Sequence, residues 1–331
     1  MRSLFSIIMP IFNLANELPL AVDSVRRQTC GDWELVLVDD GSSDGSSALC
    51  DNFAKEDLRI SVVHQSNKGV VCAREKGFGA SSGGWILFLD GDDALNSYCL
   101  ENLKQQINDN PQCDFFQFGY SWKPLIGDKI ENLPKAEGVK SANWILAHSQ
   151  KTPLEILGMC IWNKCYRRDM VMAAFGDVRD LHIAQSEDGL FAMAAFLKSS
   201  FVGFVQKSLY CYIERPDSTL HRVNTNIVHE KGLFLDRMRT LAEKSGKMTK
   251  SQIEDMIDFH AYEACCHDVF LMLMRNRATW GQMKKVLEEL NNCSFLKKDN
   301  KEWDSFKRKA MRFLLAHHVL YFCCGKLSLF K

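Results

Sequence analysis

The sequence predicts an α/β fold whose mixed, mostly parallel sheet is flanked by helices, with a helical extension at the C-terminus. In the first part of the chain, short apolar runs typical of strands alternate with segments whose apolar residues recur at helical spacing. Beyond about residue 224 the pattern is helical throughout. Strands that alternate with helices form βαβ units, and such units build parallel sheets covered by helices.

Four strands and three helices are expected in the N-terminal part. The first strand is the apolar run Phe5–Met9, which we expect to stop at Pro10. Near-continuous apolar runs at Leu35–Val38 and Ile86–Leu89 are what buried parallel strands require. The other expected elements are strands over residues 33–38, 60–64 and 85–89 and helices over 16–28, 46–56 and 70–81.

The rest of the chain divides into a mixed segment and a helical one. We expect a catalytic domain over residues 1–220 and a helical region over 221–331 that serves packing, dimerisation or membrane-surface contact. The expected strands cover 115–120 and 201–212, and the expected helices cover 187–198, 232–244, 250–275, 280–290 and 301–324.

Composition excludes several classes of protein. The 331 residues are 46% hydrophobic and 25% charged, which is ordinary for a folded protein, and the formal net charge of +0 argues against a nucleic-acid partner. Thirteen cysteines are scattered without a C-x-x-C pair, so we expect reduced, mostly buried thiols in a cytoplasmic protein rather than a zinc site. No stretch has the length of a membrane span or a signal peptide.

The clearest motif is an acidic loop, Asp90-Gly91-Asp92-Asp93, which directly follows the expected strand 85–89 and is called the second acidic loop below. In open α/β sheets, ligands bind at the carboxyl ends of the strands. Carboxylates at that edge can hold Mg²⁺ or Mn²⁺, which prefer oxygen ligands and neutralise a departing diphosphate. A solvated acidic turn is the alternative for any isolated D-x-D. The buried strand before this motif and the presence of another acidic loop in the chain favour the metal site.

Another acidic loop, which comes earlier in the chain and is called the first acidic loop below, contains Asp39 and Asp40, which close the strand 33–38. A carboxylate here can accept hydrogen bonds from a base imide or from ribose hydroxyls. Ser43 and Asp44 are also good caps for the following helix, and the two roles are compatible. Both acidic loops are therefore expected at one edge of the sheet.

Weaker motifs complete the set of candidates. The helix that follows Gly69 can face a phosphate with its N-terminus, whereas Arg74 within it can instead pair with an acidic loop. Glu187 and Asp188 start an apolar helix, where a carboxylate either takes a proton from a hydroxyl or adds favourable charge to the helix N-terminus.

A further motif, Trp162-Asn163-Lys164, combines an aromatic ring, an amide and a cation. Sugars stack on aromatic faces and bond to amides, so the motif can contact a sugar. The alternative is a buried tryptophan in an edge strand.

Taken in order, these motifs resemble the family 2 glycosyltransferases of the GT-A fold. The resemblance covers about the first 220 residues, and the ordered combination is far more specific than any of its parts. The residues that carry it are Ser6–Asn13, Glu17, Ser24–Thr29, Trp33–Ser46, Gly69–Gly77, Gly84–Asp93, Trp162–Lys164 and Glu187–Asp188.

The resemblance implies transfer of a sugar from a nucleotide-sugar donor, usually a uridine-diphospho (UDP) sugar, with inversion at the anomeric carbon. Asp92 is the implied ligand of a divalent metal (Mn²⁺ or Mg²⁺), Asp93 is a second candidate ligand, and Asp188 is the implied catalytic base. The residues implied to border or hold the donor are Pro10, Phe12, Asn13, Glu17, Asp39, Asp40, Gly69, Arg74, Asp90 and Asp92. The residues expected to contact the acceptor are Trp162, Asn163 and Glu187.

The chain departs from the family pattern at three points. Phe12 stands where tyrosine is usual, which keeps a stacking face and removes a hydroxyl. Glu75 and Lys76 stand where asparagine usually follows Ala-Arg. A Q-x-x-R-W motif is missing, which argues against a processive polymerase. A later segment, Arg215–His221, resembles the loop that closes over the diphosphate in this family, and a surface loop is its alternative.

The expected acceptor is a saccharide or a lipid-linked saccharide, as in the synthesis of bacterial surface polysaccharides. The tail Phe306–Lys331 mixes apolar and basic residues, so it can lie on the inner face of the plasma membrane, pack on the catalytic domain or join two copies into a homodimer. Two alternatives to a transferase are a non-catalytic sugar-nucleotide-binding partner and a nucleotidyltransferase. The latter would need a glycine-rich N-terminal loop, and residues 8–20 contain no glycine.

Overall fold

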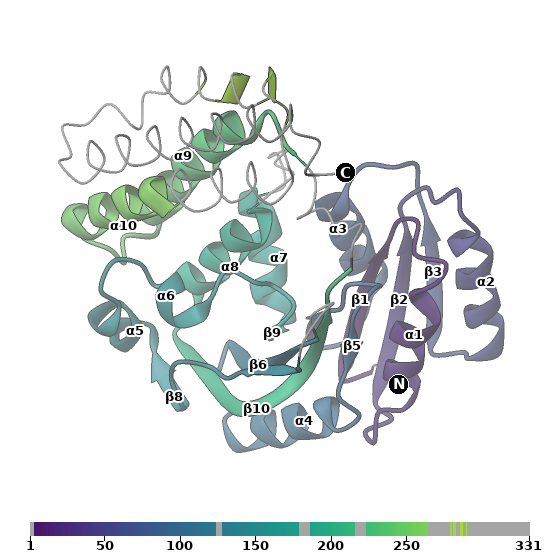
Figure 1. The fold of residues 1–331 in the computed structure, drawn as a ribbon. Coiled ribbons are helices and arrows are strands. Elements are labelled where there is room, and N and C mark those ends of the chain that lie inside the picture. Colours follow the sequence, from purple (N-terminus) through teal and green to yellow (C-terminus); the bar gives the residue numbers. More distant parts are fainter. Residues whose placement is uncertain are drawn as a thin grey trace. The chain divides into compact units, whose positions relative to one another are not determined.

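The computed structural model describes residues 3–123, 128–178, 186–215 and 223–263, and scattered residues between 279 and 289. Within these ranges the chain forms the predicted mixed sheet flanked by helices (Figure 1). His221, the expected helix over 301–324 and the basic tail lie outside the described residues. Their expected roles therefore stay predictions.

Three βα units and a fourth strand open the chain. They are β1 (Phe5–Ile11), α1 (Leu18–Arg26), β2 (Trp33–Asp39), α2 (Ser46–Glu56), β3 (Ile60–His64), α3 (Val70–Ala80) and β4 (Trp85–Phe88). The strands pair in parallel in the order β3-β2-β1-β4. Right-handed crossovers put α1 and α2 on one face and α3 on the other (Figure 1). Both acidic loops consequently leave the same edge of the sheet.

The second half of the sheet is mixed. Its elements are β5 (Ala94–Leu95), α4 (Cys99–Asp109), β6 (Phe115–Lys123), β7 (Ile130–Asn132), β8 (Gly138–Ser141), α5 (Ala142–His148), α6 (Leu154–Leu157), β9 (Lys164–Arg167), α7 (Arg168–Val178), α8 (Glu187–Lys198) and β10 (Phe201–Ile213). The order continues β4-β9-β6-β10-β5, with β9 antiparallel to both neighbours and β6 parallel to β10. Strands β7 and β8 pair with β6 and β10 respectively.

An aromatic core joins this sheet to the helices that carry the second half of the site. Phe88 of β4 lies edge-on to Phe175 of α7 and Phe191 of α8, with ring centroids 6.2 and 5.6 Å apart. Tyr166 of β9 contacts Phe191 in the same edge-on geometry. Burying each such ring contributes on the order of 2–3 kcal/mol. This packing fixes the start of α8 beside the end of β4.

Pro10 does not end the first strand, contrary to the expectation. Strand β1 continues through Pro10 to Ile11, and Pro10 is paired with Val38 of β2. The pairing with β4 already ends at Ile8, so the missing N–H of Pro10 falls beyond that ladder and costs it no hydrogen bond.

The C-terminal part that is described consists of α9 (Ile227–Ser245) and α10 (Lys250–Glu263). The chain divides into two compact units, residues 1–216 with 237–253, and residues 217–236 with 254–331. The expected boundary near residue 220 falls in the undescribed segment 216–222, so it stays a prediction. In the described part of the chain, no helix combines the length and the apolar character that crossing a bilayer requires.

The described cysteines are free thiols, and Cys30, Cys50, Cys99, Cys113 and Cys165 are buried. Burial, reinforced by the charge of Asp39, raises the pKa of Cys50 to about 12. Thiols of this kind are unreactive, so these cysteines act as small apolar core residues.

Candidate active site

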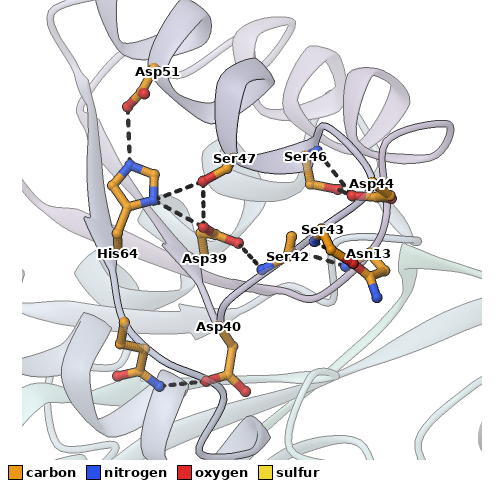
Figure 2. A network of polar contacts seen from close by, with 11 residues as sticks. Asn13, Asp39, Asp40, Ser42, Ser43, Asp44, Ser46, Ser47, Asp51 and His64 are labelled. Carbon is orange, nitrogen blue, oxygen red and sulfur yellow. Dashed lines mark hydrogen bonds and ion pairs between the residues drawn. The ribbon is translucent and has the colours of Figure 1, made fainter.

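The first acidic loop is held in place by its own carboxylates (Figure 2). Buried Asp39 accepts hydrogen bonds from the Ser42 N–H at 3.0 Å and the Ser47 hydroxyl at 2.6 Å, and it faces His64 Nδ1 at 2.9 Å. Burial alone would raise the pKa of Asp39, but the hydrogen bonds from Ser47, Ser42 and His64 lower it overall. His64 also meets Asp51 at 3.1 Å, and hydrogen bonds with Asp39 and Asp51 raise the pKa of the imidazole.

Asp40, the next residue, ties the first acidic loop to the entrance of α3. One carboxylate oxygen accepts from Gln65 Nε2 and from the N–H of Lys68, both at 2.8 Å. The other oxygen accepts from the N–H of Gly69 at 2.8 Å. Gly69 precedes α3 with φ 87°, a left-handed conformation that favours glycine. The structure thus brings the predicted residues Asp40 and Gly69 together, and Asp40 shapes the loop in which Gly69 lies.

The loop after β1 leans on the same acidic loop. Asn13 has φ 55°, which asparagine tolerates better than most residues. Its side-chain oxygen accepts from the N–H of Ser43 at 2.8 Å, and its own N–H donates to the Ser42 hydroxyl at 3.1 Å. Phe12 beside it is 48% exposed, so its ring is available for stacking. Pro10 is buried within β1.

In the second acidic loop, Asp93 points inward and anchors β10. Its carboxylate accepts from the Tyr210 hydroxyl at 2.6 Å and from the N–H of Ile213 at 2.7 Å. Burial, followed by the charges of Asp92 and Asp90, raises the pKa of Asp93 to about 8. With both oxygens engaged, Asp93 positions the loop, and its metal role stays a prediction.

Asp92 of the same loop contacts an arginine, Arg215. Arg215, just after β10, donates to Asp92 through Nη2 at 2.8 Å and Nε at 2.9 Å, and its Nη1 lies 3.6 Å from Glu17. Burial and the charge of Asp90 raise the pKa of Asp92, and Arg215 opposes them. Glu17 and Asp92, distant in sequence, therefore share one cation.

Arg74 links the second acidic loop to the start of α8. This arginine is 4% exposed. Its Nη2 lies 2.9 Å from Asp90, and its Nη1 lies 2.7 Å from Asp188 and 3.8 Å from Glu187. Burial would lower the pKa of Arg74, but the charges of Asp188, Asp90 and Glu187 raise it overall. Of the two expected roles of Arg74, pairing with an acidic loop is the one the structure shows.

The two acids that open α8 share an unusual environment. Burial and the charge of Asp188 raise the pKa of Glu187 to about 8, whereas Arg74 opposes them. Burial also raises the pKa of Asp188, again against Arg74. The second oxygen of Asp188 faces the N–H of Ile161 at 3.5 Å. A small pocket, partly open to solvent, is lined by both acids and by Arg74. A carboxylate with a raised pKa at a pocket is typical of a general base.

The predicted acceptor residues Trp162 and Asn163 are buried next to β9. The Trp162 ring stacks on Tyr210 at 4.5 Å and lies nearly parallel to Tyr212 at 6.0 Å between centroids. The Asn163 side-chain oxygen accepts from Lys164 Nζ at 2.9 Å. Strand β9 lies between β4 and β6, so Trp162 precedes an interior strand and the edge-strand alternative is wrong. Acceptor contact by both residues stays a prediction.

Sequence reasoning missed two residues that the structure places in or beside the site. Tyr210 donates to Asp93, and His64 supports Asp39. Lys164 belongs to a predicted motif, but its hydrogen bond to the Cys160 carbonyl oxygen was not predicted. His64 could have been found, because it ends the strand next to Asp39 at the same edge of the sheet. Tyr210 carries no such signal, since its partner Asp93 lies far away in the chain.

The second acidic loop suits a divalent cation by its donor chemistry. Asp90 and Asp92 offer carboxylate oxygens, the ligands that Mg²⁺ and Mn²⁺ prefer. Asp92 has a raised pKa because it is buried beside Asp90, and a divalent cation would offset that repulsion. Among the described residues, no three His, Cys, Asp or Glu side chains form a ready ligand set. Diphosphate oxygens and water would complete the coordination, as is usual for Mg²⁺.

Residues 6–175 match the protein family described as Glycosyl transferase family 2. The chain belongs to this family. It is a glycosyltransferase, which decides against the nucleotidyltransferase alternative. Over 225 residues it is 32% identical to the uncharacterized glycosyltransferase EpsJ of Bacillus subtilis, an alignment that covers 66% of this chain and 63% of EpsJ.

Two solved structures share its GT-A fold. TarS of S. aureus, solved as residues 1–349 with UDP-GlcNAc, superposes with a TM-score of 0.67 at 19% identity and covers 92% of this chain and 84% of that one. The mannosyltransferase PcManGT of Pyrobaculum calidifontis, solved with GDP-Man and Mn²⁺, gives a TM-score of 0.51 at 12% identity and covers 97% and 81%. At these identities the likeness establishes the fold, and the predicted fold class is confirmed.

Proposed function

We propose that this glycosyltransferase moves a sugar from a UDP-sugar to a hydroxyl of a saccharide or lipid-linked saccharide, with inversion at the anomeric carbon and the help of a divalent cation. The observation on which the proposal rests is that Arg74 contacts two acidic residues of the site at once. One buried guanidinium contacts Asp90, 2.9 Å away on the expected donor side, and Asp188, 2.7 Å away at the expected base. The residue expected near the leaving group, Asp90, and the residue expected to accept the acceptor proton, Asp188, are therefore linked by the same arginine. The UDP-GlcNAc complex of TarS supports a uridine donor.

The nucleotide would lie against the first acidic loop. Phe12 offers an exposed ring for the base, and Asn13 holds the adjoining turn through Ser43. Asp39 and Asp40 keep this edge negatively charged and shaped, with Asp40 bonded to the loop before α3. Base and ribose contacts through their remaining lone pairs are part of the proposal.

The diphosphate would lie at the second acidic loop. Asp90 and Asp92 would hold the divalent cation, which when bound neutralises the charge that develops on the leaving UDP. Arg215 reaches Asp92 at 2.8 Å from the segment after β10, so its guanidinium is also close to the expected diphosphate. Arg74 lies between Asp90 and Asp188 and contacts both carboxylates, so its positive charge reduces the repulsion between them.

Asp188 would act as the general base. The acceptor hydroxyl oxygen forms a bond to C1 of the sugar while its proton passes to the Asp188 carboxylate. The bond between C1 and the diphosphate oxygen breaks, and its electron pair leaves with UDP. Attack opposite the leaving group inverts C1. A base with a raised pKa binds this proton more readily, and burial raises the pKa of Asp188.

A binding experiment and a turnover experiment test the proposal. Calorimetric titration with UDP should show binding that strengthens when Mn²⁺ is present, with GDP as the matched control nucleotide and weaker. A screen of UDP-sugars should then identify at least one donor from which the protein releases UDP. The proposal would be overturned if the affinity for UDP were the same with and without Mn²⁺ and no UDP were released from any donor.

A further inference from the structure

Lys164 is a buried cation for which the proposed reaction has no direct use. It belongs to the interior strand β9 and is 1% exposed. Burial lowers the pKa of its ammonium group to about 8, against the opposing charges of Cys160 and Asp188. Burying a lysine is costly unless its donors are satisfied. Two donors are satisfied nearby: Nζ lies 2.5 Å from the carbonyl oxygen of Cys160 and 2.9 Å from Oδ1 of Asn163.

The Cys160 carbonyl belongs to the same peptide group as the N–H of Ile161. That N–H faces Oδ2 of Asp188 at 3.5 Å. A peptide group is planar, and its carbonyl and N–H point in opposite directions. A cation on the carbonyl end therefore directs the N–H end toward the carboxylate and polarises it as a donor. The contact is long, as contacts of catalytic groups often are before substrate binds.

The two oxygens of Asp188 consequently have different partners. Oδ1 accepts from Arg74 Nη1 at 2.7 Å, and Oδ2 faces the peptide that Lys164 holds. Arg74 also donates a hydrogen bond to Asp90, so Arg74 alone does not fix the orientation of the Asp188 carboxylate. The peptide on the other side supplies the second constraint.

We infer that Lys164 is a positioning residue for the proposed base, holding the Cys160–Ile161 peptide so that its N–H faces and orients the Asp188 carboxylate. The inference rests on the proposed function, in which Asp188 takes the acceptor proton. It assigns Lys164 a role in setting the rate of proton transfer, with no contact to the donor.

The effect on pH dependence has a definite sign. The groups that face Asp188 are Arg74 from α3, Asp90 after β4, Glu187 from α8, and Cys160, Lys164 and Tyr166 from β9 and the segment before it. The cation Lys164 and the N–H of Ile161 favour the charged form of Asp188, whereas Asp90 and Glu187 disfavour it. Removing Lys164 must therefore raise the pKa of Asp188 further and move the acidic limb of the rate profile to higher pH.

Lys164→Met is the principal test variant, because methionine fills the volume of the lysine stem without a donor or a charge. With the UDP-sugar that the wild type turns over best, we expect kcat to fall by about 10- to 100-fold, as for misplaced catalytic groups. The donor KM should change by less than about twofold, and the acidic limb should move up by about one pH unit. Lys104→Met, which removes a half-exposed lysine, is the matched control and should change none of these. An unchanged kcat, or a loss that appears in the donor KM with a fixed pH limb, would overturn the inference.

A second readout needs no turnover and separates this inference from the proposed function. In protein labelled at aspartate ¹³Cγ, the Asp188 signal is assigned by its loss in Asp188→Asn and titrated in the wild type and in Lys164→Met. The Asp188 pKa should be higher in the variant, and an equal pKa refutes the role of Lys164 even if the enzyme is active. A raised pKa together with full activity of Asp188→Asn supports Lys164 and refutes the base assignment instead.

A second variant provides a test if Lys164→Met fails to fold. Lys164→Gln, which keeps a donor without the charge, is then compared first and should show a smaller loss of kcat with the same direction of pH shift. An unchanged kcat and an unchanged acidic limb in Lys164→Gln would contradict the inference.

Discussion

The two acidic loops lie at the same edge of one sheet, yet they hold their charges in opposite ways. In the first, hydroxyl, backbone and imidazole donors satisfy Asp39, and the pKa of this carboxyl is lowered. In the second, burial and the charge of Asp90 raise the pKa of Asp92, and burial and the charges of Asp92 and Asp90 raise the pKa of Asp93. Uncharged donors and one imidazole stabilise the first loop, whereas two arginines, Arg74 and Arg215, stabilise the second.

This difference suits the two tasks that we propose. A loop whose carboxylates are satisfied internally keeps one shape and can receive a neutral base and ribose without rearranging. A loop that concentrates negative charge gains most when a divalent cation arrives, and an acid with a raised pKa gains most when a proton arrives. The following changes test whether the two loops are separable in this way.

The largest effect should follow loss of the base. Asp188→Asn keeps the shape of the side chain and removes its capacity to take a proton, so kcat should fall by about 10²- to 10⁴-fold. UDP affinity should stay within about threefold of the wild type, because the first loop is untouched. Steady-state rates and calorimetry measure the two quantities, with Asp23→Asn, which alters an exposed acid of α1 outside the site, as the control that retains activity. An equal loss of UDP affinity and of kcat would show that nucleotide binding and proton transfer cannot be separated by this substitution.

Removing Arg74 should affect both stability and turnover. Arg74→Met leaves Asp90, Glu187 and Asp188 without their shared cation, and breaking a buried pair costs about 3 kcal/mol or more. The loss of stability should shrink as pH falls through the raised pKa of Glu187, about 8, and below it, because protonated acids no longer need the arginine. Urea unfolding at several pH values measures it. Arg74→Lys should recover part of the stability, and a pH-independent loss would contradict the charge account.

Asp92→Asn should separate metal from nucleotide. The affinity for Mn²⁺ in the presence of UDP should fall by at least about tenfold, since even partners outside the ligand shell are worth that much. UDP binding without metal should change little. Asp51→Asn, which alters an acid on α2, is the control. Retention of full Mn²⁺ dependence in Asp92→Asn would move the metal site elsewhere.

The smallest effect should come from the first loop itself. His64 has a raised pKa, so its contribution to stability is present below the unfolded pKa of about 6.5 and is lost as pH rises through the higher folded value. His64→Gln should therefore lower Tm at about pH 5.5, by about 1–2 °C because the ring is partly exposed, and less at about pH 8.5. Asp51→Asn, which removes one of the two acceptors, should give roughly half the change. A larger loss at the higher pH would reverse the assigned sign.

Much of the fold could be predicted from local pattern. The expected bounds of α2, β3 and α8 agree with the structure. The two helices begin and end with polar residues, and β3 is a short apolar run that ends at His64. The acidic loops could be placed at one edge, since parallel strands share their carboxyl ends. The prediction that the first strand ends at Pro10 was wrong. Whether a strand tolerates a proline there depends on where its pairing with β4 ends, which the sequence of β1 does not reveal.

The pairing within the site could not be predicted in the same way. Arg74 and Asp188 are 114 residues apart, and nothing local distinguishes this arginine from one that binds phosphate. Asp93 looked equivalent to Asp92, yet Tyr210 and Ile213 take both of its oxygens. Such choices depend on how β10 returns to the sheet, which is a matter of tertiary packing rather than of residue spacing.

The stereochemistry of the first product molecules tests the central claim most directly. With a UDP-sugar whose sugar is α-linked, proton NMR during the first turnovers should show the β-anomer, because a single displacement assisted by Asp188 inverts C1. Inversion predicts a β-glycosidic linkage between the transferred sugar and the acceptor. The α-anomer as first product would require a covalent intermediate or a front-side attack, and it would contradict the assignment of Asp188 as the base of a direct displacement.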